Sequence, residues 1–354
     1  MKRYFFLWAV IFSFITGASW ATDLNELLPD EKNTVEVFQK CSPNVVYVHR
    51  LATVVNNLYE RMQIPAGAGS GIIWDNQGHI VTNYHVIAGA DNLAVTIDKY
   101  TVPAKVIGAE PRKDIAVLAV QSPKALAFLK SFVPFPLVQT QSLLVGQKAI
   151  AIGNPFGLDH SLTVGVISAL GRQVPGAGGV KIRDMIQTDA SINPGNSGGP
   201  LLDSHGKLIG LNTAIYSNSG ASVGIGFAVP ADDVARIASQ IIKEGRVVLA
   251  GIGVQVIQPH IATRLGVESG LLIDNVLPKT PAAQVGLIGT YRDGWGRIHL
   301  GDIIVALNGH PIKDYDNFYN LLTNITVGEE INLTVLRQGK TLRIKLKTID
   351  IAAY

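Results

Sequence analysis

Between residues 45 and 229 the chain consists of short apolar segments, and turn residues separate them at close intervals. The segment SGIIW is separated from HIVTN by the turn DNQG, and similar segments follow, among them KAIAIG, LTVGVISAL and IGFAVP. Many short segments at this spacing predict an all-β barrel or sandwich. The 36 glycines in 354 residues fit a chain with many turns. Helical periodicity is nearly absent here, so we predict a mainly β fold.

The first clear helical pattern follows Pro230. Apolar residues recur there at helical spacing, namely Val234, Ile237, Ala238, Ile241 and Ile242. Asp232 and Asp233 lie where a helix N-terminus favours negative charge, and Gly245 lies where a helix commonly ends. The sequence therefore predicts a helix over 231–244 that closes a first domain.

A second β-rich region of about 100 residues starts at GIGVQV. It contains LGDIIVALNGHPI, a helical pattern in DYDNFYNLL, and the run INLTVLRQGKTLRIKLK. The last run predicts a β-hairpin with RQGK at its tip. This region has the size of a separate small domain.

The first 21 residues differ from the rest. Lys2 and Arg3 precede an apolar run over 4–16, and the small residues Ser19 and Ala21 follow it. This pattern is typical of a secretory signal, because a membrane span needs about 20 apolar residues. Two interpretations stay open, a cleaved signal and a retained N-terminal anchor. They predict the periplasm or another exported compartment, or anchoring in the inner membrane facing the periplasm. Residues 22–40 carry only weak structural signals.

Charge and composition exclude several classes of function. Removing residues 1–21 would lower the formal net charge from +3 to +1, and no basic run is interleaved with aromatics, so we expect no nucleic-acid partner. The only cysteine, Cys41, allows no intramolecular disulfide and is expected to be buried. The histidines are scattered without metal-ligand spacing, and no phosphate-binding loop of the GxxxxGK[ST] type occurs. We therefore expect no metal, no cofactor and no dependence on ATP.

The loop INPGNSGGP, residues 192–200, places Ser197 among glycines and prolines. A nucleophilic serine needs a base and a group that orients the base. His85 in VTNYHVI and Asp114 in RKDIAVL precede it, in the order His, Asp, Ser that chymotrypsin-like enzymes share. We predict that His85 accepts the Ser197 proton and that Asp114 fixes the imidazole tautomer. Each residue alone also fits a structural role, as a core histidine, a strand-start cap and a turn serine.

The same loop predicts an oxyanion hole. Backbone N–H groups of Gly195, Asn196 and Ser197 are the candidates to bind the negative oxygen of a tetrahedral intermediate. Glycine at 195 permits backbone angles that other residues avoid.

Several motifs together resemble the HtrA/Deg serine proteases. They are GSGIIWDNQGHIVTN, TNYHVI, DIAVL, IGNPFGL, TVGVISALGR, IQTDASINPGNSGGPL and GIGFAVP, and they cover nearly all of residues 66–230 in the family's order. The resemblance implies a chymotrypsin-like double β-barrel over 41–245 and a PDZ domain over 251–349, of which GDIIVALNG is the most recognisable segment. It also implies a homotrimer or a multiple of trimers.

The substrate pocket is predicted from the chymotrypsin-like pattern. Ser191, six residues before the nucleophile, would lie at the pocket base, and its neutral side chain argues against cleavage after Lys or Arg. The remaining pocket candidates are Ile192, Thr213, Ala214 and Ile215. Because Ile215 leaves little room for a large ring, we expect a preference for small aliphatic residues, as the resemblance also implies.

Regulation is predicted at two places. Asn196 replaces the aspartate that digestive relatives use to bind a new N-terminus, so we expect activation by reordering of loops 155–163, 173–184, 189–196 and 215–223. In the PDZ-like region, Gly251, Ile252, Gly253 and Val254 would hold the carboxylate of an apolar C-terminal peptide in a backbone nest. The alternative for this segment is a plain strand start.

The function predicted first is an exported, ATP-independent serine endopeptidase that degrades unfolded or damaged proteins in quality control and stress response. Two alternatives stay open. One is a membrane-anchored protease that cuts a specific signalling substrate. The other is a chaperone or peptide-binding scaffold with secondary proteolysis.

Overall fold

The computed structural model describes residues 24–55, 61–155, 157, 159–175, 181–193, 195–215 and 224–351. Of residues 55, 61, 62, 65, 214 and 215 only the backbone is described. The predicted signal or anchor, residues 1–21, lies outside these ranges. No helix within them is both long enough and apolar enough to cross a membrane.

The first half of the chain closes into a β-barrel with strand order β1-β2-β3-β6-β5-β4. The strands are β1 (Val45–Val55), β2 (Arg61–Ile73), β3 (His79–Thr82), β4 (Asn92–Ile97), β5 (Tyr100–Glu110) and β6 (Ile115–Val120). Every neighbouring pair is antiparallel. Because the barrel closes on itself, apolar strands such as β6 are buried and no strand edge stays unpaired.

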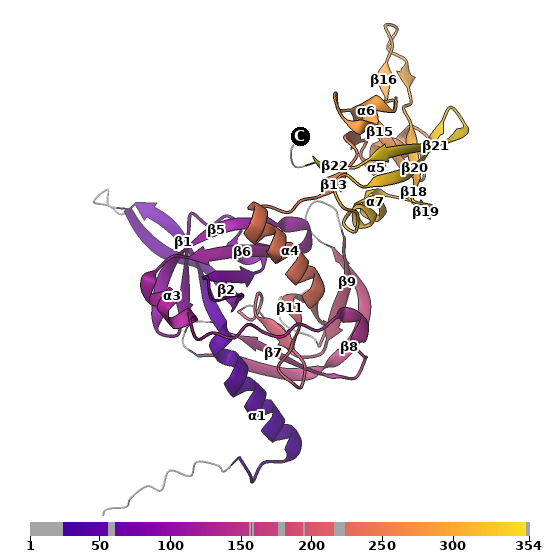
Figure 1. Ribbon diagram of the computed structural model, residues 1–354. Helices are drawn as coiled ribbons and strands as arrows, with labels where there is room; N and C mark the ends of the chain where they lie inside the picture. Colours follow the sequence, from indigo (N-terminus) through magenta and orange to yellow (C-terminus); the bar gives the residue numbers. More distant parts are fainter. Residues whose placement is uncertain are drawn as a thin grey trace, which may run out of the picture.

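A second closed barrel follows, with strand order β10-β11-β12-β9-β8-β7. Its strands are β7 (Lys148–Gly153), β8 (Ser161–Pro175), β9 (Lys181–Thr188), β10 (Pro200–Leu202), β11 (Leu208–Ile215) and β12 (Gly226–Pro230). The mainly β fold and its double-barrel form are confirmed, and Figure 1 shows the two barrels side by side with helix α4 (Ala231–Glu244) across them.

Helix α4 confirms the predicted boundaries. Its buried face includes Val234, Ile237 and Ile241, and Gly245 ends it in the left-handed conformation at φ 72°. These side chains join one core cluster with Val117 of the first barrel and Ile150 of the second. The helix therefore helps hold the two barrels together, and burial of each such side chain stabilises the fold by about 1.5–3 kcal/mol.

A helix that the sequence did not indicate precedes the first barrel. Helix α1 (Pro29–Cys41) begins with a proline and two acidic residues, and only Val37 and Cys41 are buried along it. Cys41 is buried as predicted, and that burial raises the pKa of its thiol. Short helices complete this half: η1 (Ser42–Asn44), α2 (Tyr84–Ile87), η2 (Pro111–Lys113), α3 (Pro123–Leu129) and η3 (Thr140–Ser142).

The C-terminal region forms a separate sheet with strand order β14-β15-β18-β20-β21. The strands are β14 (Val254–Val256), β15 (Leu271–Val276), β18 (Ile303–Leu307), β19 (His310–Pro311, paired with β18), β20 (Glu330–Arg337) and β21 (Lys340–Lys347). Helices α5 (Pro259–Arg264), α6 (Pro281–Gln284) and α7 (Tyr315–Leu322) accompany the sheet, as do the pairs β13 (Ala250–Gly251) with β22 (Ile349–Asp350) and β16 (Tyr291–Arg292) with β17 (Ile298–His299). The predicted hairpin is confirmed, and its turn uses left-handed Gln338 and Gly339.

Helix α7 lies against the double barrel. The Asp316 carboxylate pairs with Arg183 of β9 and also accepts a hydrogen bond from the Lys181 backbone N–H at 2.8 Å. The Arg112 guanidinium lies over the Tyr319 ring, 4.9 Å from its centroid. Burial raises the pKa of Tyr319 to about 12, with the Glu110 carboxylate contributing. Arg112 lies two residues before Asp114, so the C-terminal domain contacts the double barrel close to a predicted catalytic residue.

Candidate active site

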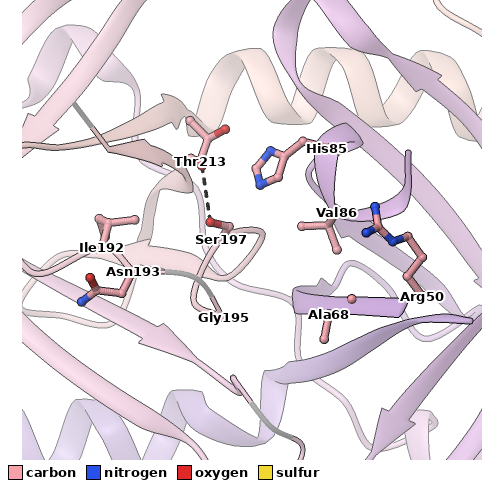
Figure 2. A pocket seen from close by; sticks show the side chains of 10 residues that line it. Arg50, Ala68, His85, Val86, Ile192, Asn193, Gly195, Ser197 and Thr213 are labelled. Carbon is pink, nitrogen blue, oxygen red and sulfur yellow. Dashed lines mark hydrogen bonds between the residues drawn. The ribbon is translucent and has the colours of Figure 1, made fainter. Parts of the chain in front are cut away.

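A cleft of about 370 Å³ contains both predicted reactive side chains (Figure 2). It is lined by Arg50, Gly67, Ala68, His85, Val86, Ile192, Asn193, Gly195, Ser197 and Thr213. His85 lies on α2 and Ser197 on the loop before β10, so each barrel contributes one side of the cleft.

His85 and Asp114 form a hydrogen-bonded pair. The distance between His85 Nδ1 and Asp114 Oδ2 is 2.7 Å, and the His85 backbone N–H donates to Asp114 Oδ1 at 2.9 Å. Asp114 adopts a left-handed conformation, φ 55°, between η2 and β6, which turns its carboxylate toward α2. The carboxylate is 16% exposed and the imidazole 49%, so the base faces the cleft while its partner lies behind it. A carboxylate at Nδ1 leaves Nε2 available to accept a proton.

Thr213 adds a contact that sequence reasoning did not find. Its hydroxyl donates a hydrogen bond to Asp114 Oδ2, and its side chain is buried. Thr213 comes from β11 of the second barrel, so this contact links the two barrels behind the His85 ring. A hydroxyl on the sixth residue of a strand of the second barrel carries no sequence signal of its own for this contact.

The Ser197 hydroxyl lies in the same cleft but does not bond to His85. It donates to the Thr213 carbonyl at 3.4 Å, and no described hydrogen bond joins it to the imidazole. In Figure 2 the Ser197 side chain lies below Thr213, with the His85 ring to its upper right. The hydroxyl therefore has to exchange its bond to the Thr213 carbonyl for one to the imidazole before His85 can take its proton.

Two backbone amides remain available beside Ser197. Those of Gly195 and Ser197 donate to no acceptor in the described part of the chain. Gly195 has φ +111°, and a Cβ there would lie 2.3 Å from the Pro155 Cβ, so only glycine fits. Such a pair of free donors is what an oxyanion hole requires.

A fully buried serine from the first barrel holds this loop. Ser70 Oγ donates to the Gly195 carbonyl at 2.6 Å and accepts from the Asn154 backbone N–H at 2.8 Å. The Ser70 backbone N–H also donates to the Ser197 carbonyl at 2.9 Å. The motif GSGII contains this residue, but its partners are distant in the sequence.

Asn196 differs from the expectation that its amide belongs to the oxyanion hole. Its backbone N–H donates to the Asn193 carbonyl at 3.1 Å. Its side chain is turned inward, where Oδ1 accepts from the Asn193 N–H at 2.8 Å and Nδ2 donates to the Ser191 carbonyl at 3.0 Å. Because its donors are engaged within the loop, Asn196 stabilises the loop and offers no amide to an oxyanion in this conformation.

Comparison with known proteins identifies both domains. Residues 69–211 match the family described as trypsin-like peptidase domain, and residues 250–348 match PDZ domain. Protease Do-like 1, chloroplastic, of Arabidopsis thaliana is 49% identical over 315 residues, which are 88% of this chain and 70% of that protein. The chain belongs to the HtrA/Deg family of serine proteases.

Two further similarities extend the comparison. A probable periplasmic serine endoprotease DegP-like of Brucella suis is 41% identical over 288 residues, 80% of this chain but 52% of that protein, so the chain spans about half of it. Among solved structures, HtrA-type protease AlgW with decapeptide aligns with a TM-score of 0.69 and 31% identity over 89% of this chain and 98% of that one. The chain is thus a serine endoprotease with a PDZ domain.

The predicted pocket residues of this HtrA/Deg protease are only partly gathered at the cleft. Ile192 and Thr213 line it, whereas Ser191 is exposed, and its carbonyl accepts hydrogen bonds from Thr163 and Asn196. The side chains of Ala214 and Ile215 lie outside the described residues. So do 156, 158, 176–180, 194 and 216–223, which make up much of the loops predicted to reorder.

The predicted carboxylate loop joins β13 to β14 in the PDZ domain. The backbone N–H groups of Ile252 and Gly253 have no acceptor in the described ranges, and Gly253 is left-handed at φ +84°. The Ile252 side chain is buried in the PDZ core, while Val254 is half-buried on edge strand β14. Gly251 pairs with Ile349, and a Cβ there would overlap Ile351.

Metal ligands were not predicted, and among the described residues no three His, Cys, Asp or Glu side chains are grouped so that they could hold an ion. No cofactor was predicted either.

Proposed function

We propose that this HtrA/Deg endoprotease degrades unfolded or damaged proteins without ATP, as part of protein quality control in an exported compartment. Ser197 is the nucleophile, His85 the base and Asp114 the group that orients it. The observation that carries the proposal is the 2.7 Å His85–Asp114 pair facing a cleft that also holds Ser197. The free amides of Gly195 and Ser197 support the same assignment.

The reaction follows from these positions. Ser197 Oγ turns from the Thr213 carbonyl toward His85, loses its proton to Nε2 and attacks the scissile carbonyl. The amides of Gly195 and Ser197 bind the oxyanion, and loss of one such donor typically costs about 10²–10³ in rate. The imidazolium, stabilised by Asp114, then protonates the leaving amine as the C–N bond breaks, which leaves the acyl group on Ser197 Oγ as an ester. Water hydrolyses the acyl-enzyme by the same steps.

The PDZ domain binds peptides, and we assign its ligand as an apolar C-terminal peptide. The peptide would extend the sheet at β14, and its carboxylate would meet the free amides of Ile252 and Gly253. Such binding would act on the protease through the α7 contacts to Arg183 and Arg112. Homotrimers, or multiples of them, complete the proposal. Calorimetry tests the carboxylate contact: amidating the peptide C-terminus should remove most of the binding.

The test compares the wild type with Ser197→Ala on an unfolded casein-like protein and on a stable folded protein, without nucleotide. We expect the wild type to cut only the unfolded substrate, mainly after Val, Ile or Ala, and the variant to lose activity at least about 10⁴-fold. A majority of cuts after Arg, Lys or Phe would reject the pocket assignment. If the wild type does not cleave but both proteins suppress aggregation equally, a chaperone or scaffold is the better description.

Localisation requires a separate measurement. The relatives include proteins named as periplasmic and as chloroplastic. N-terminal sequencing of the native protein should find residue 22 first if residues 1–21 are removed, whereas an intact N-terminus in the membrane fraction would favour the anchored, signalling protease.

A further inference from the structure

Arg50 lies in the cleft at a place where neither the chemistry nor the predicted pocket requires a charge. It belongs to β1 and lines the cleft together with Gly67, Ala68 and Val86. Figure 2 shows it beyond His85 and Val86, on the side away from Ile192 and Thr213.

The guanidinium is fixed by neutral acceptors only. Its Nε and Nη2 donate to the Ala66 carbonyl at 3.2 and 2.8 Å, and Nη1 donates to the Ala88 carbonyl at 2.9 Å. A Cβ at Gly67 would lie 2.9 Å from Nη2, so the absence of a side chain there lets the guanidinium lie flat against the backbone. The charge is therefore held in place, not free to move with a flexible stem.

The positive charge has no carboxylate partner in the described ranges, where no Asp or Glu oxygen lies within 4 Å of it. An arginine has five N–H donors, of which these contacts use three. Two donors are thus left for a ligand. A half-buried, preorganised guanidinium with spare donors is well suited to bind a carboxylate.

The position of Arg50 relative to Ser197 indicates which part of a bound substrate would contact the guanidinium. The acyl half of the substrate points toward Ile192 and Thr213, the residues predicted for the substrate pocket. The leaving amine must lie at His85, which protonates it. The chain that continues from this amine therefore leads away from Ile192 and Thr213, toward the side of the cleft that Val86, Ala68 and Arg50 line.

We propose that Arg50 is a specificity-determining residue for the leaving-group side, where it binds an acidic side chain at the second or third residue after the cleaved bond. The inference rests on the assignment of Ser197 and His85 in the proposed function. Nothing in the cleaved bond itself changes, so the effect is on substrate choice.

The experiment uses internally quenched peptides with Val before the cleaved bond and Asp, Asn or Lys at the second or third position after it. For the full-chain wild type we expect kcat/KM to be about three- to tenfold higher for Asp than for Asn at one of these positions, and lowest for Lys. The preference should shrink as salt rises from about 0.05 to 0.5 M, because a half-exposed pair is screened. Equal rates for the three peptides at both positions would overturn the proposal, whatever the variants do.

Substitutions of Arg50 distinguish a role of its positive charge in substrate choice from a purely structural role. Arg50→Gln should abolish the Asp preference, and Arg50→Glu should invert it in favour of Lys. Lys105→Gln removes an exposed positive charge on β5 outside the cleft and should leave the preference intact. If Arg50→Gln lowers kcat/KM by the same factor for all three peptides, Arg50 only supports the loops at Ala66 and Ala88, and the proposal is wrong. A wild type that cleaves no peptide would instead count against the proposed function.

Discussion

The first barrel supplies His85 and Asp114, the second supplies Ser197 and Gly195, and the two barrels hold their residues differently. The His85–Asp114 pair is held mainly by contacts within its own barrel, where the His85 backbone N–H and the Asn83 amide also donate to Asp114, and the Thr213 hydroxyl adds one contact from the second barrel. The Ser197 hydroxyl instead bonds to the Thr213 carbonyl at 3.4 Å, and its loop depends on Ser70 from the other barrel. We infer that the base is preformed and that, among the described residues of the site, only the Ser197 hydroxyl has to be repositioned before the reaction.

Asp114→Asn should disrupt the preformed His85–Asp114 pair, and it should lower kcat more than the substitutions that follow. The asparagine amide would donate to His85 Nδ1 and place the imidazole proton on Nε2, which then cannot accept the Ser197 proton. We expect kcat to fall about 10⁴-fold while the fold is retained. Steady-state kinetics on a peptide substrate measures the loss, and the urea midpoint serves as control. A loss below about 100-fold would mean that the pair does not act as assigned.

Ser70→Ala should weaken the loop that carries Gly195 and Ser197, because Ser70 of the first barrel bonds to this loop. The change leaves the Gly195 carbonyl and the Asn154 N–H without their buried partner, and we expect stability to fall by about 1–3 kcal/mol. If the loop then shifts the Gly195 amide, kcat should fall about 10- to 100-fold with little change in KM.

The control for Ser70 is Ser131→Ala, which removes an exposed hydroxyl bonded to the Phe128 carbonyl at 3.3 Å. It should alter neither stability nor kcat measurably. If Ser70→Ala loses stability but keeps full kcat, the oxyanion loop is rigid without it, and the contrast between the two halves is smaller than the geometry suggests.

How far the sequence could predict this molecule depends on whether a feature is local. Helix α4 was predicted to the residue because its apolar stripe packs on both barrels, and the β20–β21 hairpin because its turn needs left-handed residues. Helix α1 was missed because only Val37 and Cys41 are buried along it, which leaves almost no periodic signal.

The same distinction between local and long-range features applies to the residues of the candidate site. The order and flanking motifs of His85, Asp114 and Ser197 predict them as a triad, and the structure brings them to one cleft region. The roles of Ser70, Thr213 and Arg50 depend on contacts between residues far apart in the chain, which one sequence does not reveal. The amide of Asn196, predicted as an oxyanion donor, bonds to the Asn193 carbonyl in this structure, because the glycines of a loop indicate accessible amides but do not show which amide the loop itself uses.

Asp233→Asn tests whether the His85–Asp114 pair also depends on α4. Of the three substitutions Asp114→Asn, Ser70→Ala and Asp233→Asn, it should lower kcat least. The Asp233 carboxylate pairs with Lys113 at 3.2 Å and with Arg236 at 2.6 Å, and Lys113 immediately precedes Asp114. Although burial alone would raise it, the Lys113 and Arg236 cations bring the pKa of Asp233 below its ordinary value of 3.8. The variant leaves the buried Lys113 ammonium without a charged partner, so we expect a loss of about 2 kcal/mol at pH 7.

The pH dependence follows from the direction of that pKa shift. A carboxylate whose pKa is lower in the folded state contributes stability that is fully present above the unfolded value, 3.8 for Asp233, and that is lost as the pH falls through the folded value. Urea unfolding of both proteins should therefore give a difference that is constant from pH 7 to about 5 and shrinks below pH 3.8. Glu244→Gln, which removes an exposed pair with Lys243, should change stability by less than about 0.5 kcal/mol at either pH.

The effect of Asp233→Asn on kcat shows whether α4 also positions the His85–Asp114 pair. If the variant lowers kcat as strongly as Ser70→Ala does, this pair is held by α4 as much as by its own barrel. The Ser197 hydroxyl is then no longer the only described part of the site whose position has to be set.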